Sequence, residues 1–224
     1  MTDHSLLYFQ NLFDPKASEI TPFLQEYSYP WEILPDLKAI LLALGEKLEQ
    51  KGYRQIQPQI WTGENTAISP TAELNAPCII GHGTEIRHCA YIRGSVIIGN
   101  NCVVGNSTEL KNAILFDRVQ VPHYNYIGDS ILGKGAHLGA GSVISNLKSD
   151  GTTVKITVSG EKLETGMRKL GAMVGDGVEA GCGCVLNPGT IIGRGSRIYP
   201  LNSVRGVIPA GHVYKSREEI IPIR

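Results

Sequence analysis

Apolar residues recur at every sixth position along most of this chain. A helix repeats every 3.6 residues and a coiled coil every seven, so neither explains a period of six. A hexapeptide period is typical of a parallel β-helix, in which each hexad forms one face of a triangular prism and three hexads form one coil. We therefore predict an all-β solenoid. The apolar positions are Ile68, Leu74, Ile80, Ile86, Ile92, Ile98, Val104, Leu110, Phe116, then Tyr126, Leu132, Leu138, Ile144, and finally Val174, Ala180, Leu186, Ile192, Ile198, Val204.

Two segments lack this period. Apolar residues in the first segment have the spacing of one helical stripe, which predicts a helix from Pro35 to a stop at Gly52, preceded by an irregular start. In the second segment Val154, Ile156 and Val158 alternate with polar residues before a Ser-Gly pair, which predicts a protruding β-hairpin. We thus expect an N-terminal helical segment over 1–58 and a β-helix over 59–224, with the hairpin inserted at 147–171.

Charge and hydropathy argue against a nucleic-acid partner, a membrane span and secretion. The 21 Lys and Arg residues balance 21 Asp and Glu residues, so no nucleic-acid partner is expected. No apolar run is long enough to cross a bilayer, and the start lacks the features of a signal peptide, which predicts no membrane span and a cytoplasmic protein. Among the five cysteines, Cys78, Cys102 and Cys184 occupy the small inward position of the hexad, where a free thiol packs as a modest hydrophobe.

Two basic residues replace the glycine that often follows the apolar position. Arg93 and Lys111 are three hexads apart, so they should lie on the same corner of adjacent coils, with backbones about 4.8 Å apart. Two cations this close repel one another unless an anion lies between them, and a phosphate is a natural candidate. The alternative is that a nearby carboxylate, Glu85 or Glu109, neutralises them as a surface ion pair.

A second irregularity lies at Pro122–Tyr126, where the period shortens from six residues to four. It brings His123 to a corner, and histidine can accept a proton near neutral pH. Asn146 follows where the solenoid opens into the hairpin; its amide could orient a hydroxyl, or could simply form a turn. The six histidines show no metal-ligand spacing, since His82 and His88 fall on different faces, so no metal site is predicted.

The region from Arg93 to Asn146 carries a specific resemblance. Its segments Asn106-Ser-Thr-Glu-Leu-Lys111, His123-Tyr-Asn-Tyr126-Ile-Gly-Asp129 and Leu138-Gly-Ala140-Gly resemble the acetyltransferase domain of the bacterial bifunctional N-acetylglucosamine-1-phosphate uridyltransferase and its archaeal relatives. The likeness covers about residues 66–217. It implies a left-handed β-helix, a homotrimer, and acetyl-CoA-dependent N-acetyl transfer to an amino-sugar phosphate such as glucosamine-1-phosphate, with no metal required.

The resemblance also implies roles for individual residues. His123 matches the general base of that family. The phosphosugar would be bound by Arg93, Lys111, Tyr126 and Asn146, with His137 at a further substrate position, and acetyl-CoA by Ala140, Cys182 and Arg217.

Several positions depart from the family pattern. His137 replaces an asparagine, Leu147 a tyrosine, Cys182 a serine and Pro200 an alanine, while Lys148 or Lys155 would have to substitute for a missing lysine. Residues 1–58 are too short for a nucleotidyltransferase domain, so uridyltransferase activity is not expected. Two alternatives stay open: a non-catalytic sugar-phosphate sensor or scaffold, and a metal-dependent, carbonic-anhydrase-like hydratase.

Overall fold

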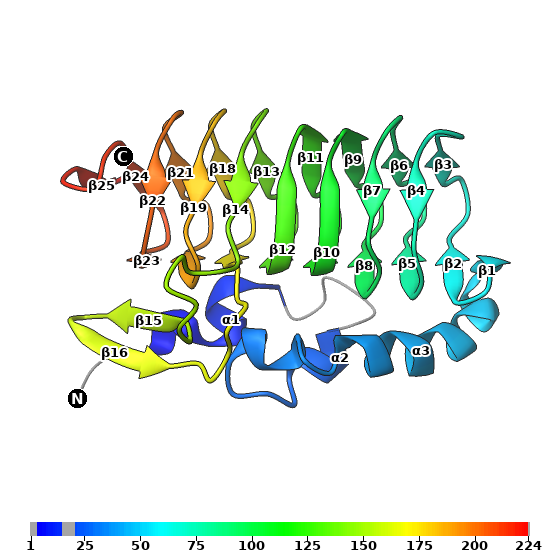
Figure 1. Ribbon diagram of the computed structural model, residues 1–224, viewed down its shortest axis with the longest axis horizontal. Helices are drawn as coiled ribbons and strands as arrows, with labels where there is room; N and C mark the ends of the chain where they lie inside the picture. Colours follow the sequence, from blue (N-terminus) through cyan, green and yellow to red (C-terminus); the bar gives the residue numbers. More distant parts are fainter. Residues whose placement is uncertain (1–3, 15–20, 224) are drawn as a thin grey trace.

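The computed structural model describes residues 4–14 and 21–223, and it shows a solenoid of about nine turns with a second layer along one side (Figure 1). The solenoid is a left-handed parallel β-helix; the hexapeptide period predicted the parallel β-helix, and the resemblance implied its left-handed sense. Each coil contributes a short strand to each of three faces, and strands of successive coils pair in parallel.

We name the three faces in chain order. The first face contains β2 (Ile60–Thr62), β5 (Cys78–Ile80), β8 (Val96–Ile98), the second halves of β10 (Glu109–Leu115) and β12 (Tyr126–Leu132), β17 (Ala172–Val174), β20 (Thr190–Ile192) and β23 (Val207–Ile208). The second face contains β3 (Ala67–Ile68), β6 (Glu85–Ile86), β9 (Val103–Asn106), β11 (Gln120–His123), β13 (His137–Leu138), β18 (Glu179–Ala180), β21 (Arg197–Ile198) and β24 (His212–Tyr214). The third face contains β4 (Glu73–Leu74), β7 (Tyr91–Ile92), the first halves of β10 and β12, β14 (Val143–Ile144), β19 (Val185–Leu186) and β22 (Ser203–Val204).

Two further strands pair in the antiparallel sense at the solenoid ends: β1 (Arg54–Gln57) with β2, and β25 (Ile220–Pro222) with β24.

The strand register corrects two of the predicted inward positions. Most coils repeat after three full hexads, but Ala113 pairs with both Val96 and Ser130, so the coils on either side of Ala113 each lack a residue. Leu115 therefore takes the inward position predicted for Phe116, whose side chain is buried outside the solenoid instead. Two faces later, on the third face, Ile127 takes the inward position predicted for Tyr126. A strict count of six misses these positions because it cannot detect a single deletion at a corner.

The solenoid interior is apolar throughout and includes the three predicted cysteines. Cys78, Cys102 and Cys184 are buried in it. Burial raises the pKa of the Cys78 thiol to about 12, and that of Cys102 also to about 12, because a thiolate would lose its hydration there. The repeated glycines allow the backbones of neighbouring coils to approach closely at the corners. A Cβ on Gly105 would lie 1.6 Å from the carbonyl oxygen of Pro122 in the next coil.

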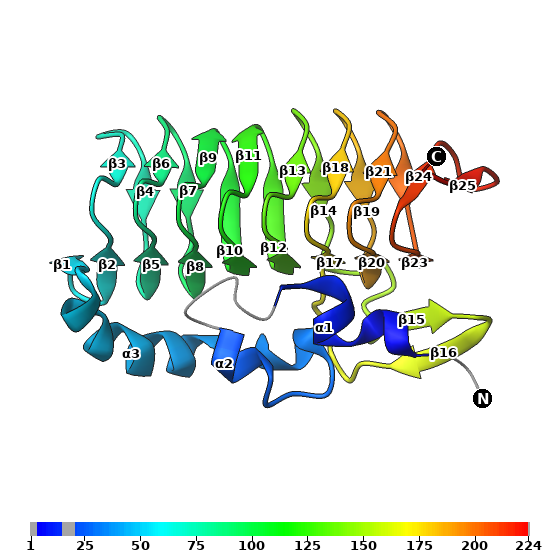
Figure 2. The same cartoon turned by 180° about the vertical axis from the view of Figure 1, so that it is seen from behind.

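A second apolar layer covers the outside of the first face (Figures 1 and 2). It contains η1 (Ser5–Leu7), α1 (Phe9–Leu12), α2 (Thr21–Leu24), η2 (Pro30–Ile33), α3 (Leu37–Leu48) and η3 (Glu49–Lys51). The predicted helix is confirmed, beginning after Asp36 and ending at Gly52, while the start predicted to be irregular forms short helices where it is described. These helices bury the outward side chains of the first face, which include Ile79, Ile97, Ile114, Phe116, Ile131, Met173 and Ile191.

The predicted hairpin is present as β15 (Lys155–Val158) and β16 (Glu161–Glu164), paired in the antiparallel sense. It lies in the same layer as the N-terminal helices, and Val154, Ile156 and Val158 are buried in that layer's core. Within residues 4–14 and 21–223, no helix is long and apolar enough to cross a membrane.

Candidate functional site

A polar cluster occupies the corner between the third and first faces, where the two shortened coils each lack a residue. In the preceding coil this corner is the turn Arg93-Gly94-Ser95 between two separate strands. In the next two coils β10 and β12 run through the corner as continuous strands. The bend falls at Asn112 and Asp129, which both adopt φ of 49°. Asn and Asp tolerate this left-handed conformation better than other non-glycine residues, so the shortened coils place two polar side chains here.

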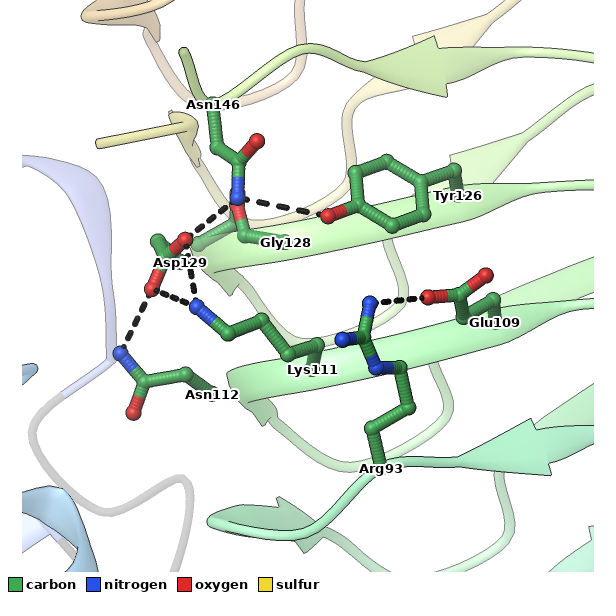
Figure 3. A network of polar contacts seen from close by, with 9 residues as sticks. Arg93, Glu109, Lys111, Asn112, Tyr126, Gly128, Asp129 and Asn146 are labelled. Carbon is green, nitrogen blue, oxygen red and sulfur yellow. Dashed lines mark hydrogen bonds and ion pairs between the residues drawn. The ribbon is translucent and has the colours of Figure 1, made fainter. Parts of the chain in front are cut away.

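Asp129 is the centre of this cluster (Figure 3). Its side chain is 4% exposed, and its carboxylate pairs with the ammonium of Lys111 at 3.0 and 3.1 Å. Asn112 Nδ2 donates to the same carboxylate at 2.8 Å, and Asn146 Nδ2 donates to its second oxygen. A buried carboxylate is stable only when its oxygens are satisfied in this way. Asp129 therefore holds together side chains from three successive coils.

Tyr126 and Asn146 extend the cluster across the third face. Asn146 Nδ2 donates to the Tyr126 hydroxyl at 3.3 Å, and a Cβ on Gly128 would lie 2.6 Å from that hydroxyl oxygen. Only glycine leaves room for this contact. Burial, together with the nearby carboxylates of Glu109 and Asp129, raises the pKa of Tyr126. The hydroxyl thus stays protonated at neutral pH and can donate a hydrogen bond to a ligand.

The two predicted cations lie on the same corner of adjacent coils, as their spacing indicated, and each has a protein carboxylate beside it. Arg93 Nη1 pairs with Glu109 at 2.7 Å, and this partner raises the pKa of Arg93. The neutralising role considered for Glu109 is therefore observed, whereas Glu85 pairs with Arg87. Because protein carboxylates offset the repulsion, the spacing of Arg93 and Lys111 does not by itself require a bound anion.

His123 lies at a different corner, between the second and third faces. It ends β11 and is exposed, and its backbone N–H donates to Asn125 Oδ1 at 3.2 Å. Asn125 is buried, and its amide donates to the carbonyls of Gly139 and Ser142 in the next coil. The hexad at this corner has its full length, since Val121 and Ile127 are the inward residues on either side. The shortening predicted at Pro122–Tyr126 thus belongs to the neighbouring corner.

Ala140 and Cys182, two of the three predicted cofactor residues, lie in a column with His123 along the same corner. Gly141 N–H donates to the His123 carbonyl, Gly183 N–H to the Ala140 carbonyl, and Leu201 N–H to the Cys182 carbonyl. This column therefore aligns His123, Ala140 and Cys182 on successive coils, with exposed Pro200 on the next.

The remaining predicted residues lie elsewhere. His137 is on the second face and pairs with Glu179 at 2.8 Å. Lys148 and Lys155 pair with Asp150 and Glu164, and both line a pocket beside the hairpin that Arg217 also lines. Within the described part of the chain, no group of three or more His, Cys, Asp or Glu side chains could hold a metal ion.

Three residues of these corners were not among the predicted site residues: Asn112, Asn125 and Asp129. A sequence signal for Asp129 did exist, because it stands three hexads after Lys111 in a segment that interrupts the period. Its role as an acceptor for three donors depends on side chains from separate coils, which the period alone does not align.

Comparisons with known proteins agree with this fold. Residues 57–159 match the family model described as the EIF2B subunit epsilon left-handed β-helix domain. The chain is 30% identical over 206 residues to a bifunctional sugar-1-phosphate nucleotidylyltransferase/acetyltransferase of Sulfurisphaera tokodaii, covering 89% of this chain and 51% of that protein. It is 32% identical over 184 residues to the bifunctional protein GlmU of Methanococcus maripaludis, covering 80% of this chain and 44% of that protein.

The chain thus spans about half the length of these curated relatives. Among solved structures, PerB from Caulobacter crescentus in complex with CoA and GDP-perosamine matches with a TM-score of 0.36 and 18% identity, covering 79% of this chain and 61% of that one.

Proposed function

We propose that this chain, which belongs to the left-handed β-helix family of hexapeptide-repeat proteins, is an acetyl-CoA-dependent N-acetyltransferase whose acceptor is an amino-sugar phosphate resembling glucosamine-1-phosphate. The sequence similarity to sugar-1-phosphate acetyltransferases over most of this chain supports the reaction class. The single observation that carries the proposal is the polar cluster around Asp129, which shares the third face with His123.

The acceptor would lie across the third face, between its two corners. Lys111 and Arg93 would bind the phosphate, since both side chains keep donors that their carboxylate partners leave free. Tyr126 and Asn146 would orient the sugar ring through hydroxyl and amide contacts. This arrangement directs the amine toward the opposite corner, where His123 is exposed.

The chemistry would then be acyl transfer assisted by a general base. The amine nitrogen attacks the thioester carbonyl of acetyl-CoA and His123 takes the proton that the nitrogen loses. The carbon–sulfur bond breaks, and the thiolate leaves and is protonated. General-base assistance of this kind contributes typically about 10²–10⁴-fold to the rate. Asn125 would be a positioning residue, because it fixes the backbone of the His123 corner from inside the solenoid.

A homotrimer would complete the site, with acetyl-CoA bound along the Ala140–Cys182 column at the boundary between subunits. Large apolar side chains are exposed on that corner, where Tyr124 is 64% and Leu201 is 84% exposed. Exposed groups of this size are typical of an interface. The free cysteines of the described residues are compatible with a reducing cytoplasm.

The test is thiol release from acetyl-CoA with glucosamine-1-phosphate as acceptor. We expect His123→Ala to lose at least about 100-fold in kcat, because the general base is removed. The control is His88→Ala, which removes an exposed histidine at the same corner two coils away and should keep wild-type turnover. Retained turnover in His123→Ala would exclude that base.

Arg93→Ala should raise KM for the phosphorylated acceptor without changing KM for acetyl-CoA. Equal effects on the two KM values would contradict a phosphate contact.

One observation favours a second candidate, a sugar-phosphate sensor or scaffold. Arg93 and Lys111 already have carboxylate partners, so the cluster is stable without catalysis. Titration with acetyl-CoA separates the two functions, because a sensor of the acceptor alone would not bind the donor.

A further inference from the structure

The hairpin builds one wall of a pocket that takes no part in the acceptor binding or the proton transfer proposed above. Along β15 the apolar side is buried against the second layer, so Lys155 and Thr157 face the other way. Thr157 lies opposite Lys162 of β16, which is therefore on the same side of the hairpin. Because its apolar side is held in a core, this two-stranded wall presents its polar side in a fixed position.

The opposite wall comes from the last coils of the solenoid and from the tail. The pocket has a volume of about 560 Å³, and its lining includes five basic side chains: Lys148, Lys155, Lys162, Arg205 and Arg217. Of the described residues, no Asp or Glu lines it. In a chain whose formal charges sum to zero, five cations around one cavity are a marked concentration of positive charge.

Protein carboxylates neutralise only part of this charge. Lys155 pairs with Glu164 at 2.5 Å and Lys148 with Asp150 at 3.3 Å. Among the described residues Lys162, Arg205 and Arg217 have no carboxylate within ion-pair distance, and Arg205 instead donates to Asn187 Oδ1 at 3.1 Å. Three uncompensated cations facing one cavity repel each other unless an anion enters.

The pocket also offers neutral groups suited to phosphate oxygens. Thr157 and Ser159 contribute hydroxyls, and Gly160, Gly189 and Gly206 bring backbone without side chains to the lining. Gly206 has φ of 87°, so a side chain there would be strained. Proteins recognise phosphoryl oxygens through arginine guanidinium groups, lysine ammonium groups, hydroxyls and backbone N–H groups that no side chain covers.

This pocket is separate from the cluster at Asp129, although both lie on the corner between the third and first faces. The register aligns Lys111, Gly128, Ser145, Asn187 and Arg205 on successive coils. Four steps of about 4.8 Å place Arg205 roughly 19 Å along the solenoid from Lys111. One phosphate cannot contact both sites.

We propose that this hairpin pocket binds a small molecule that carries a diphosphate or a comparable group of two or more phosphoryl units. Three cations without a carboxylate partner among residues 4–14 and 21–223 exceed what a single phosphate needs, and the volume accommodates more than one phosphoryl group. The group has two possible sources: a free diphosphate, or the phosphates of coenzyme A, since Arg217 lies in this pocket. The binding site itself does not depend on the acetyl transfer proposed above.

The test measures binding of inorganic pyrophosphate to the full chain by isothermal titration calorimetry. Loss of one charge-assisted contact weakens binding roughly tenfold, so Lys162→Gln/Arg205→Gln should raise the Kd about 100-fold. The control is Lys47→Gln/Arg54→Gln, which removes the same charge from exposed residues at the other end of the solenoid. Its Kd should stay within about twofold of wild type. Equal losses in both double variants, or no pyrophosphate binding by the wild type, would overturn the proposal.

Coenzyme A and dephospho-coenzyme A then identify the source. Displacement of pyrophosphate by coenzyme A, with a weaker effect of the dephospho form, assigns the pocket to the phosphates of the donor. Simultaneous binding of coenzyme A and pyrophosphate assigns it to a free diphosphate, and both results support the pocket. The chain could also bind pyrophosphate while it neither binds coenzyme A nor shows transferase activity. That result would reject the proposed transferase function and leave the proposed diphosphate pocket standing.

Discussion

Replacing Asp129 by Asn removes one charge at the centre of the polar cluster and little else. Asparagine has nearly the same shape and tolerates the left-handed backbone that Asp129 adopts. Its amide would place a donor group among Lys111, Asn112 and Asn146, which are donors already. Lys111 would then keep its charge without a carboxylate partner, while its side chain is only 26% exposed.

Removing one partner of a fully buried ion pair costs about 3–5 kcal/mol, and the partial exposure of Lys111 reduces this cost. We expect Asp129→Asn to lower the free energy of unfolding by roughly 2–3 kcal/mol. The measurement is urea denaturation followed by circular dichroism, with an unchanged slope and a lower midpoint. Glu109→Gln is the control, since it also removes a carboxylate, but from an exposed ion pair, and it should shift the midpoint far less.

A double-mutant cycle tests the cause directly. Lys111→Met alone leaves the Asp129 carboxylate buried with two amide donors, and the double variant leaves no unpaired charge. The double variant should therefore lose less stability than the sum of the single variants, by at least about 1 kcal/mol. Additive losses, or an Asp129→Asn variant within about 0.5 kcal/mol of wild type, would refute the assignment of Asp129 as the centre of the cluster.

Two further predictions concern the interior and the second layer. Because burial raises the pKa of the Cys78 and Cys102 thiols to about 12, the unfolded chain ionises first, near pH 9. The free energy of unfolding should thus fall by about 1.4 kcal/mol per pH unit per thiol between pH 9 and 12, and a Cys78→Ala/Cys102→Ala variant should lose this slope in urea titrations. An unchanged pH slope in the Cys78→Ala/Cys102→Ala variant would contradict the assignment of this slope to the two buried thiols. Phe116→Ala should cost about 3–5 kcal/mol and expose the N-terminal layer to limited proteolysis, because Phe116 packs on Phe13 with ring centroids 5.3 Å apart. The control is Ile56→Ala, which shortens an exposed side chain of β1, and equal protection of both variants would contradict the packing of Phe116 in the second layer.

The sequence predicted more of the fold than of the site. The hexapeptide period, the helix ending at Gly52 and the hairpin were all readable because each depends on neighbours close in the chain. A further signal went unused: several strands of the first face are apolar at three consecutive positions, as in Val96-Ile97-Ile98, whereas a strand such as Glu179–Ala180 on the second face is shorter and has a polar outward residue. That pattern indicates a face covered on both sides, and the helices cover it.

At the candidate site, the sequence identified the corner shared by Arg93 and Lys111 but not the network that surrounds them. A single deletion moves every later residue to a new position on its coil, so the site depends on register between coils rather than on spacing within one. Glu109 and Asp129 became partners of the cations only when that register was known.

The amino-acid order alone determined that this chain coils with about three hexads per turn, because the period is a local property that most coils repeat. It also determined which side chains are candidates for chemistry. Tertiary structure decided which of them meet: it joined Lys111, Asn112 and Asn146 through Asp129, left His123 on the neighbouring corner, and gathered five cations around the hairpin pocket. The reason is physical. Contacts between coils depend on how many residues form each corner, and the three-dimensional path of the backbone sets that number.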